Sequence, residues 1–324
     1  MNVIYVKQDL TLAQRIKLKW NNFCNSTFPQ KGDSLSSIIE KIVMIICSIL
    51  FLSSCFYLCY KFVIEPQLTE NSYSEYRDNY DATVSSSDNG VWKAVSETDT
   101  KKNEDGTIVD FDKLISLNKD VVGWITVPNT VINYPVLQNK NNPKYYLDHD
   151  INKNKAGAGA IFVDSKCTIS QDGNSKSLIL YGHHRRDGTM FARILKYSDI
   201  NFYKENPVIR FDTKYEKSKW VVFAIIKANT LKSQGTPFIY PISSWSSDAE
   251  FLDYIEEVEK RSLINTPIEV IASDEIIMLS TCSYEYEGFR TVVFARKLRT
   301  GETTIDVSSA KKASKPLMPD IWYR

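Results

Sequence analysis

The sequence predicts a mostly β domain, a barrel or a sandwich, that follows one transmembrane helix near the N-terminus. Nine short apolar segments lie between residues 123 and 296, separated by turns that contain Gly, Pro, Asn and Asp. This spacing is typical of all-β domains. Residues 42–60 form a stretch without a charged side chain, which is about long enough to cross a bilayer as a helix.

The charges on either side of this stretch indicate its orientation. Residues 1–41 carry six Lys or Arg against three Asp or Glu, and residues 61–81 carry two against five. Positive charge stays on the cytoplasmic side, so we expect residues 1–41 in the cytoplasm and the chain beyond residue 60 outside the cell membrane. A cleaved signal peptide and a lipoprotein box at Leu52-Ser-Ser-Cys55 are the alternatives, but the chain stays apolar through Tyr60.

Residues 61–107 are polar and rich in Ser, Asp and Asn, and two interpretations remain open for them. Tyr73, Tyr76 and Tyr80 have helical spacing, which favours a juxtamembrane helix packed on the following domain. A flexible extracytoplasmic stalk is the alternative. Next, Asp110 is expected to cap a short helix with an apolar face at Phe111, Leu114 and Ile115.

Strands dominate the rest of the chain. They are expected at residues 123–127, 131–137, 160–163, 177–183, 208–211, 220–226, 269–272, 275–282 and 290–296. Helices are expected at 189–197 and at 248–261, the second with an apolar stripe at Phe251, Leu252, Ile255 and Val258. For the tail, residues 300–324, a disordered end is the default, with docking of Trp322 and Tyr323 as the alternative.

The end of the segment 275–282 carries the candidate chemistry. Cys282 closes an apolar run, and Arg290 opens the next run after a loop that contains Gly288. A hairpin would therefore place the thiol beside a guanidinium, which favours the reactive thiolate. A disulfide between Cys282 and Cys167 is the competing interpretation, because both residues are predicted to lie outside the cell.

Two of the three histidines end another apolar segment, at His183 and His184. Imidazole is the usual proton shuttle of cysteine catalysis near neutral pH. Neighbouring residues of a strand point to opposite faces, so only one of the two is expected to face Cys282.

These motifs, in this order, resemble the sortases, cysteine transpeptidases of the Gram-positive cell surface. The signature Leu279-Ser-Thr-Cys282, the pair Gly182-His183 and Arg290 carry the resemblance, and Ser280 resembles class B. Three flanking motifs also resemble class B, at residues 121–128, 132–136 and 187–191. The resemblance implies a closed β-barrel over residues 108–299, which follows the anchor predicted at 42–60.

The resemblance also implies the roles of the site residues. Cys282 is expected to be the nucleophile, His183 the general acid and base, and Arg290 the group that stabilises the oxyanion and positions substrate. Thr281 and Ser280 are expected to contact substrate. No metal and no organic cofactor are expected.

The implied reaction is transpeptidation of secreted proteins that carry a C-terminal sorting signal. A thioacyl-enzyme would pass the acyl group to an amine of a peptidoglycan precursor, a cross-bridge or a pilin. The 40 basic and 39 acidic residues nearly cancel, so nothing indicates a nucleic-acid partner. A caspase-like cysteine peptidase and a non-catalytic binding module are the alternatives.

Overall fold

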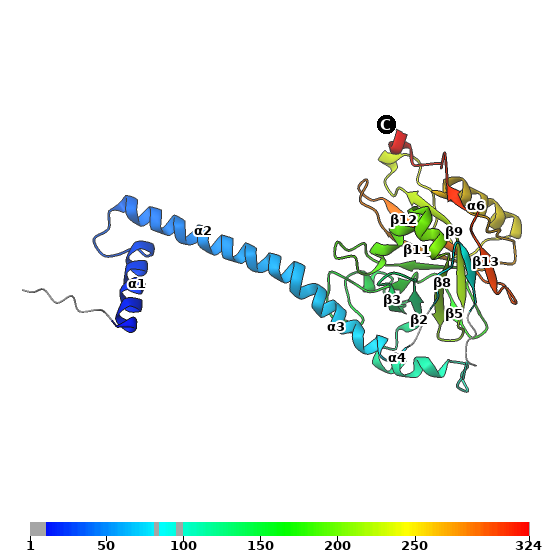
Figure 1. Cartoon of the computed structure of the whole chain (residues 1–324), viewed down its shortest axis with the longest axis horizontal. Helices are drawn as coiled ribbons and strands as arrows, with labels where there is room; N and C mark the ends of the chain where they lie inside the picture. Colours follow the sequence, from blue (N-terminus) through cyan, green and yellow to red (C-terminus); the bar gives the residue numbers. More distant parts are fainter. Residues whose placement is uncertain (1–10, 81–83, 95–99, 324) are drawn as a thin grey trace, which may run out of the picture. The chain divides into compact units, whose positions relative to one another are not determined.

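The computed structural model describes residues 11–80, 84–94 and 100–323, and the chain divides into two compact units (Figure 1). Met1–Gln67 form the first unit and Leu68–Arg324 the second. The first unit contains α1 (Leu12–Thr27) and α2 (Leu35–Cys59). From α2 the helix continues through one π-helical turn, η1 (Tyr60–Ile64), into α3 (Glu65–Arg77).

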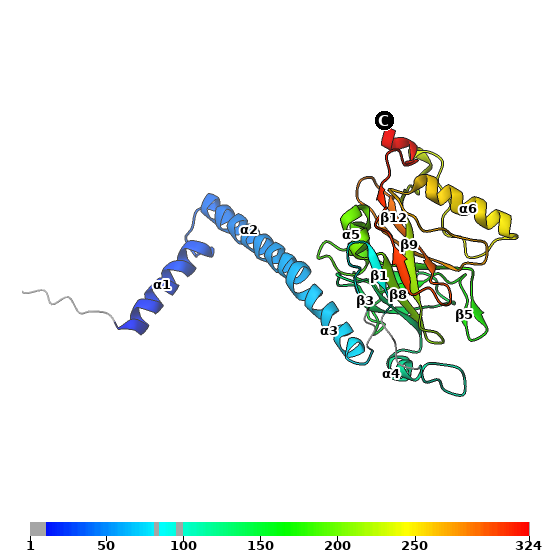
Figure 2. The same ribbon diagram turned by 45° about the vertical axis from the view of Figure 1, so that its right-hand side comes forward.

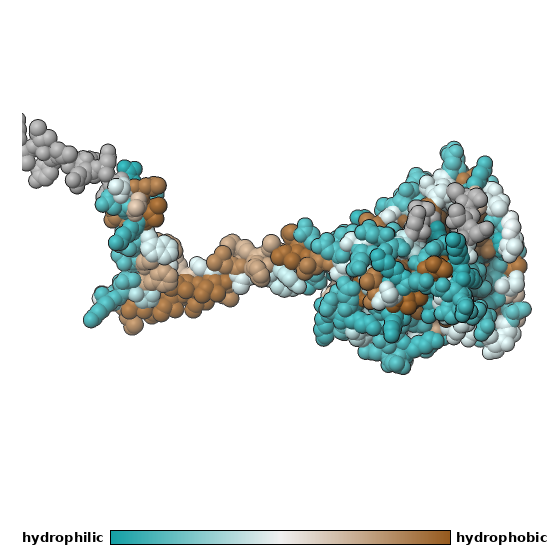
Figure 3. All heavy atoms as spheres, turned by 90° about the horizontal axis from the view of Figure 1, so that it is seen from below, coloured by the Kyte–Doolittle hydropathy of each residue, from teal (hydrophilic) through white to brown (hydrophobic). Residues whose placement is uncertain are grey.

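The long helix is the candidate membrane segment. The stretch Leu35–Arg77 contains a window apolar enough, in a helix long enough, to cross a membrane by length and composition. None of the side chains of α2 is buried, and Figure 3 shows apolar side chains along its surface. Such a helix is consistent with a membrane anchor or with a signal sequence. The predicted span, residues 42–60, lies within it.

An eight-stranded closed barrel forms the body of the second unit, which confirms the predicted fold. Its strands follow the order β11-β12-β9-β8-β2-β3-β4-β7 around the barrel. They are β2 (Val121–Thr126), β3 (Asn133–Leu137), β4 (Phe162–Val163), β7 (Ser177–Tyr181), β8 (Val208–Thr213), β9 (Lys219–Ala228), β11 (Ile276–Cys282) and β12 (Arg290–Lys297). Closure leaves the long strands without a free edge.

Shorter elements surround the barrel (Figures 1 and 2). The helices are η2 (Val109–Phe111), α4 (Asp112–Leu117), η3 (Tyr145–Leu147), η4 (Phe191–Ser198), α5 (Ile200–Glu205), η5 (Lys232–Gln234), α6 (Asp248–Arg261) and η6 (Asp320–Tyr323). Three small two-stranded sheets pair β1 (Val91–Lys93) with β13 (Thr304–Asp306), β5 (Ile169–Ser170) with β6 (Gly173–Asn174), and β10 (Ile264–Asn265) with β14 (Lys311–Lys312).

The three tyrosines with helical spacing are buried. Tyr73 and Tyr76 lie on α3, and Tyr80 follows it. The Tyr80 hydroxyl donates to the buried carboxylate of Asp212 on β8 at 2.8 Å. Its ring packs against Trp124 of β2 with centroids 5.1 Å apart. This segment is therefore a helix packed on the barrel rather than a free stalk.

Several local predictions are wrong. Residues 269–272 form no strand, because the Glu269 carbonyl accepts from Arg296 and the Ile271 amide donates to the Asp274 carboxylate instead of to a neighbouring strand. Asp110 caps no helix, since its carboxylate pairs with Lys217 and the α-helix begins two residues later.

The predicted helices are corrected in part. Helix α6 has the predicted bounds and is capped by Ser247. However, Leu252 is exposed, and Tyr254 takes the buried position on its inner face. The helix expected at 189–197 is the 3-10 helix η4 (Phe191–Ser198), and α5 after it was not predicted.

The C-terminal tail is ordered, so the default of a disordered end is wrong. It contributes β13 and β14 to the small sheets, and its last turn is η6. The Ala313 amide donates to Leu263, and the Leu317 amide donates to Lys260. Backbone pairing of this kind is a reason for a polar tail to stay in place.

Candidate active site

The hairpin of β11 and β12 delivers the first two candidate residues to one rim of the barrel. Cys282 is the last residue of β11, Arg290 is the first residue of β12, and the two are direct partners in the antiparallel register. Both side chains are half-buried. The juxtaposition predicted from the hairpin is therefore confirmed.

Strand β7 brings the histidines to the same rim. It runs parallel to β11, and Tyr181 is the partner of Ser280. Cys282 lies two residues beyond Ser280 at the end of β11, and His183 lies two residues beyond Tyr181, just after the end of β7. The Gly182 amide donates to the Ser280 carbonyl at 3.2 Å, so the two strands stay together beyond the last paired residues.

Cys282 differs from the other cysteine of the barrel unit. Cys167 is buried, and burial raises the pKa of its thiol to about 11, which keeps it protonated at neutral pH. Its Sγ lies 3.5 Å from the Ser177 carbonyl oxygen. Both cysteines are free, so the disulfide alternative is wrong and Cys282 remains available as a nucleophile.

The His183 ring is held by the long connection between β3 and β4. Its Nε2 donates to the Leu147 carbonyl at 2.6 Å. In the neutral ring this tautomer leaves Nδ1 without the proton, and hence able to accept one. Packing explains the glycine at position 182, because a Cβ there would lie 2.7 Å from the Phe191 ring.

His184 lies against the backbone of the cysteine. Its Nδ1 donates to the Cys282 carbonyl at 3.0 Å, and its ring stacks on Tyr284 with centroids 4.5 Å apart. Burial lowers the pKa of His184, and the nearby Lys227 adds to this effect, so the ring is neutral at pH 7. Strand alternation predicts that His184 turns away from Cys282, but β7 ends at Tyr181 and the alternation does not extend to His184.

The turn after the histidines is stabilised by hydrogen bonds and an ion pair among its own residues. The Asp187 carboxylate accepts from the Thr189 amide and hydroxyl and pairs with Arg185 at 2.9 Å. Met190 follows with a φ of 53°, which is strained for a residue with a side chain, and it is fully buried. The Phe191 amide then donates to the His183 carbonyl, so the motif at 187–191 returns the chain to the histidine.

Arg290 is oriented by the loop that precedes it. Its Nη1 donates to the carbonyls of Gly288 at 3.3 Å and Phe289 at 3.1 Å. Gly288 has a φ of 74° and a Cβ there would lie 2.7 Å from the Thr230 hydroxyl, so the loop requires glycine at this point. The remaining guanidinium donors are available to a substrate oxygen.

Ser280 and Thr281 are buried within the protein. The Ser280 hydroxyl lies 2.9 Å from the Tyr240 hydroxyl, and Thr281 donates to the Gly182 carbonyl at 2.6 Å. Thr281 thus joins the strand that bears the nucleophile to the residue before His183. This geometry supports a positioning role for both residues, and direct contact with substrate stays a prediction.

Lys227 was not identified from the sequence. It lies near the end of β9, is buried, and donates to the hydroxyls of Ser283 and Thr291 at 2.8 Å each and to Glu285 at 2.6 Å. Burial raises the pKa of Glu285, but the hydrogen bonds from Lys227 and Ser283 outweigh it, and the pKa lies below its usual value. A single lysine in the apolar segment 220–228 was the available signal.

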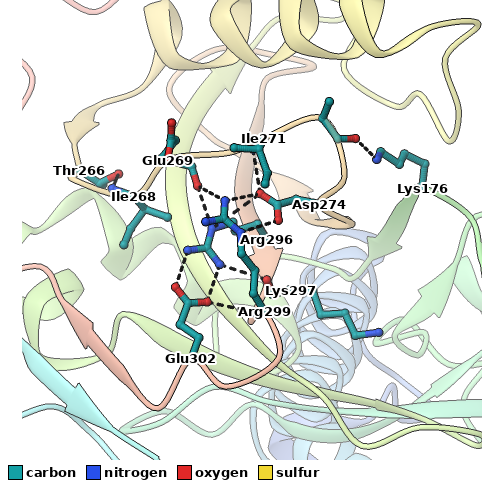
Figure 4. A network of polar contacts seen from close by, with 11 residues as sticks. Lys176, Thr266, Ile268, Glu269, Ile271, Asp274, Arg296, Lys297, Arg299 and Glu302 are labelled. Carbon is teal, nitrogen blue, oxygen red and sulfur yellow. Dashed lines mark hydrogen bonds and ion pairs between the residues drawn. The ribbon is translucent and has the colours of Figure 1, made fainter.

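The other arginine of β12 serves the opposite end of the barrel. Arg296 pairs with Ile276 in the register, is almost fully buried, and binds Glu302 through two hydrogen bonds of 2.8 Å (Figure 4). It cannot share a site with Cys282. Over residues 11–80, 84–94 and 100–323, no three His, Cys, Asp or Glu side chains gather to hold a metal ion.

Comparison with known proteins decides the family. Residues 125–298 match the sortase domain family. Sortase B of Listeria monocytogenes is 37% identical over 182 residues, 56% of this chain and 70% of the relative. Sortase B of Staphylococcus aureus is 34% identical over 58% of this chain and 74% of the relative.

The chain belongs to the sortase B family. Its members are cysteine transpeptidases, and the chain is therefore an enzyme of this class. Sortase B from B. anthracis in complex with AAEK1 superposes with a TM-score of 0.60 and 28% identity, over 73% of this chain and 99% of that one.

Two further sortase B structures resemble this chain at 34% identity. A complex of the S. aureus enzyme with substrate gives a TM-score of 0.54 over 59% of this chain and 86% of that one. A sortase B complex with triglycine gives 0.53 with the same coverage. The caspase-like alternative is wrong, since this family and the closed barrel exclude it.

Proposed function

We propose that the protein anchors secreted proteins by cleaving a C-terminal sorting signal and joining the new carboxyl end to a cell-surface amine. Cys282 passes its thiol proton to Nδ1 of His183, and the resulting thiolate attacks the scissile carbonyl and forms a thioacyl-enzyme. The departing amine takes a proton from His183. An incoming amine then attacks the thioester, loses its proton to His183 and releases Cys282.

The pairing of Cys282 with Arg290 carries this proposal. The guanidinium lies directly across the hairpin from the nucleophile, at the rim where the thioester would form. During the reaction, the same group can donate to the oxygen that becomes negative, which is where a fixed donor contributes most. The hydrogen bonds to Gly288 and Phe289 keep it fixed.

The assignment of His183 over His184 rests on the hydrogen bonds of the two rings. His184 uses Nδ1 to hold the Cys282 backbone. His183 uses Nε2 to bind Leu147, which leaves Nδ1 for proton transfer. We assign the acid and base role to His183 and a structural role to His184.

The substrate classes follow from the relatives. One S. aureus structure is a complex of sortase B with its substrate, and another sortase B structure is a complex with triglycine. We propose by analogy a sorting-signal peptide as the acyl donor and a glycine-type amine as the acceptor. The apolar helix within Leu35–Arg77 would tether the enzyme to the membrane, with its N-terminal side in the cytoplasm.

The test uses the full-length chain in detergent micelles. It is incubated with a library of sorting-motif peptides and with triglycine, and the products are identified by mass spectrometry. We expect a thioester on Cys282 and a peptide–triglycine conjugate, neither of which the Cys282→Ala variant forms. A folded wild-type protein that binds peptides without forming the thioester would favour the non-catalytic binding module.

A further inference from the structure

The C-terminal tail returns to the catalytic rim after leaving the opposite end of the barrel. Strand β12 begins at Arg290 on the rim and ends at Lys297, and the match to the sortase family ends one residue later, at Leu298. The tail then pairs with β1 and β10 in turn. Its last turn, η6, is drawn in red at the C-terminal label (Figures 1 and 2) and packs against the loop between β11 and β12.

Trp322 of this last turn packs on the loop that precedes Arg290. Its ring is stacked on Phe289 with centroids 6.2 Å apart and an interplanar angle of 15°. It also meets the edge of Tyr286 at 5.8 Å. Phe289 is completely buried although it belongs to a loop, and it directly precedes Arg290.

The contact bears on the arginine through the backbone. The Phe289 carbonyl is one of the two acceptors that orient the Arg290 guanidinium. Packing that holds the Phe289 side chain in place therefore also holds the Phe289 carbonyl that orients Arg290. At its other end, the loop is held by Lys227 through Ser283 and Glu285.

The last turn of the tail is itself held in place. The Tyr323 hydroxyl accepts from the Met318 amide at 3.0 Å and donates to the Pro316 carbonyl at 3.2 Å. Between the tail and the barrel lies a cavity of about 920 Å³, lined by Leu195, Leu263, Leu317 and Met318 among others. Because of this cavity, the tail meets the rim through its aromatic end rather than through a continuous packed layer.

From these contacts we infer that Trp322 is a positioning residue, which clamps the β11–β12 loop so that Arg290 points at the reacting carbonyl. This inference rests on the proposed function, because it acts through Arg290. Among the described residues, the ring of Trp322 packs against the rings of Tyr286 and Phe289. Its side chain is 39% exposed, so its removal is not a core deletion.

The experiment is a double-mutant cycle on the full-length enzyme in detergent, with a fluorogenic sorting-motif peptide that the wild type cleaves and triglycine as acceptor. We expect Trp322→Ala to lower kcat at least about fivefold with little change in KM, since small misplacements of a catalytic group can cost up to about a hundredfold. In an Arg290→Lys background the same substitution is expected to change kcat less than about twofold. Trp322→Phe is expected to restore most of the activity, because it keeps a ring on Phe289.

The controls separate this inference from the proposed function. Leu317→Ala shortens an exposed side chain of the same tail without removing the ring on Phe289, and it is expected to keep wild-type kcat. If Trp322→Ala matches the wild type while Cys282→Ala is dead and Arg290→Lys is impaired, the clamp is wrong and the proposed function stands. An equal loss with and without Arg290→Lys also overturns the clamp, since Trp322 would then act elsewhere. If Cys282→Ala keeps activity, the proposed function fails and the clamp falls with it.

Discussion

The imidazole of His184 holds the nucleophile by its backbone, donating from Nδ1 to the carbonyl oxygen of Cys282 at 3.0 Å. The adjacent His183 binds a different part of the protein, the Leu147 carbonyl. Two neighbouring histidines thus have two separate tasks. His184 holds the backbone of the strand that ends in Cys282, and in the proposed mechanism His183 retains a ring nitrogen for proton transfer.

Substitution of each histidine by alanine is expected to separate these tasks. His183→Ala should lower the rate of peptide cleavage by about 10²–10⁴-fold, the usual contribution of general acid–base catalysis. His184→Ala should lower it less than about tenfold, because one hydrogen bond contributes about 1 kcal/mol. The measurement is kcat for both variants, with circular dichroism to verify folding.

His184→Asn is the matched control, since an amide can still donate to the Cys282 carbonyl. We expect it to recover part of the activity that His184→Ala loses. A dead His184→Ala beside an active His183→Ala would exchange the two assignments. If both variants keep activity, neither histidine is the acid and base.

The sequence predicts the core of the site because hairpins and parallel neighbours obey simple geometry. A seven-residue loop between two apolar runs is enough to place Cys282 beside Arg290. Helix α6 was predicted at its bounds because its apolar spacing is a local signal. The closed barrel followed from resemblance, since turn spacing alone also fits a sandwich.

What the sequence missed depends on contacts between distant segments. Lys227 lies 56 positions from Ser283, and only the register of β9 with β12 brings them together. Docking of Trp322 was the alternative to a disordered tail, but its partner Phe289 could not be predicted because the two regions share no local pattern. The hydrogen bond from His184 to the Cys282 carbonyl was not predicted, because the end of β7, and with it the end of strand alternation, is not visible in the sequence.

Arg290→Lys is expected to lower kcat by tenfold or more while the fold survives. Lysine keeps the positive charge but loses the planar fork that can donate to loop carbonyls and substrate at once. Removal of one oxyanion donor typically costs about 10²–10³ in kcat. Turnover of the purified variant under saturating peptide measures this, and wild-type turnover would remove Arg290 from the mechanism.

Lys227→Met is expected to destabilise the domain by about 2 kcal/mol, because it leaves three acceptors without their shared charged donor. Urea unfolding followed by tryptophan fluorescence gives the free energy of unfolding. Adding Glu285→Gln should recover part of the lost stability, since the double variant no longer has a partly buried carboxylate without its cation. Lys260→Met, at an exposed lysine of α6, is the control and should change stability by less than about 0.5 kcal/mol. Equal effects at both positions would mean that burial of the Lys227 ammonium does not matter.

The final prediction concerns stability in acid. Hydrogen bonds from Arg296 outweigh burial and lower the pKa of Glu302 below its usual value near 4.5 (Figure 4). A carboxylate whose pKa is lowered by folding stabilises the protein fully when the pH is above its pKa in the unfolded chain. This contribution is lost as the pH falls through its pKa in the folded protein. Glu302→Gln should therefore lower the melting temperature at pH 7, and the difference from the wild type should shrink below about pH 4.5.

Glu104→Gln, which removes an exposed carboxylate, should leave the melting temperature close to that of the wild type throughout. If the difference in melting temperature between Glu302→Gln and the wild type stays constant from pH 7 to pH 3, protonation of Glu302 does not disrupt a stabilising ion pair with Arg296.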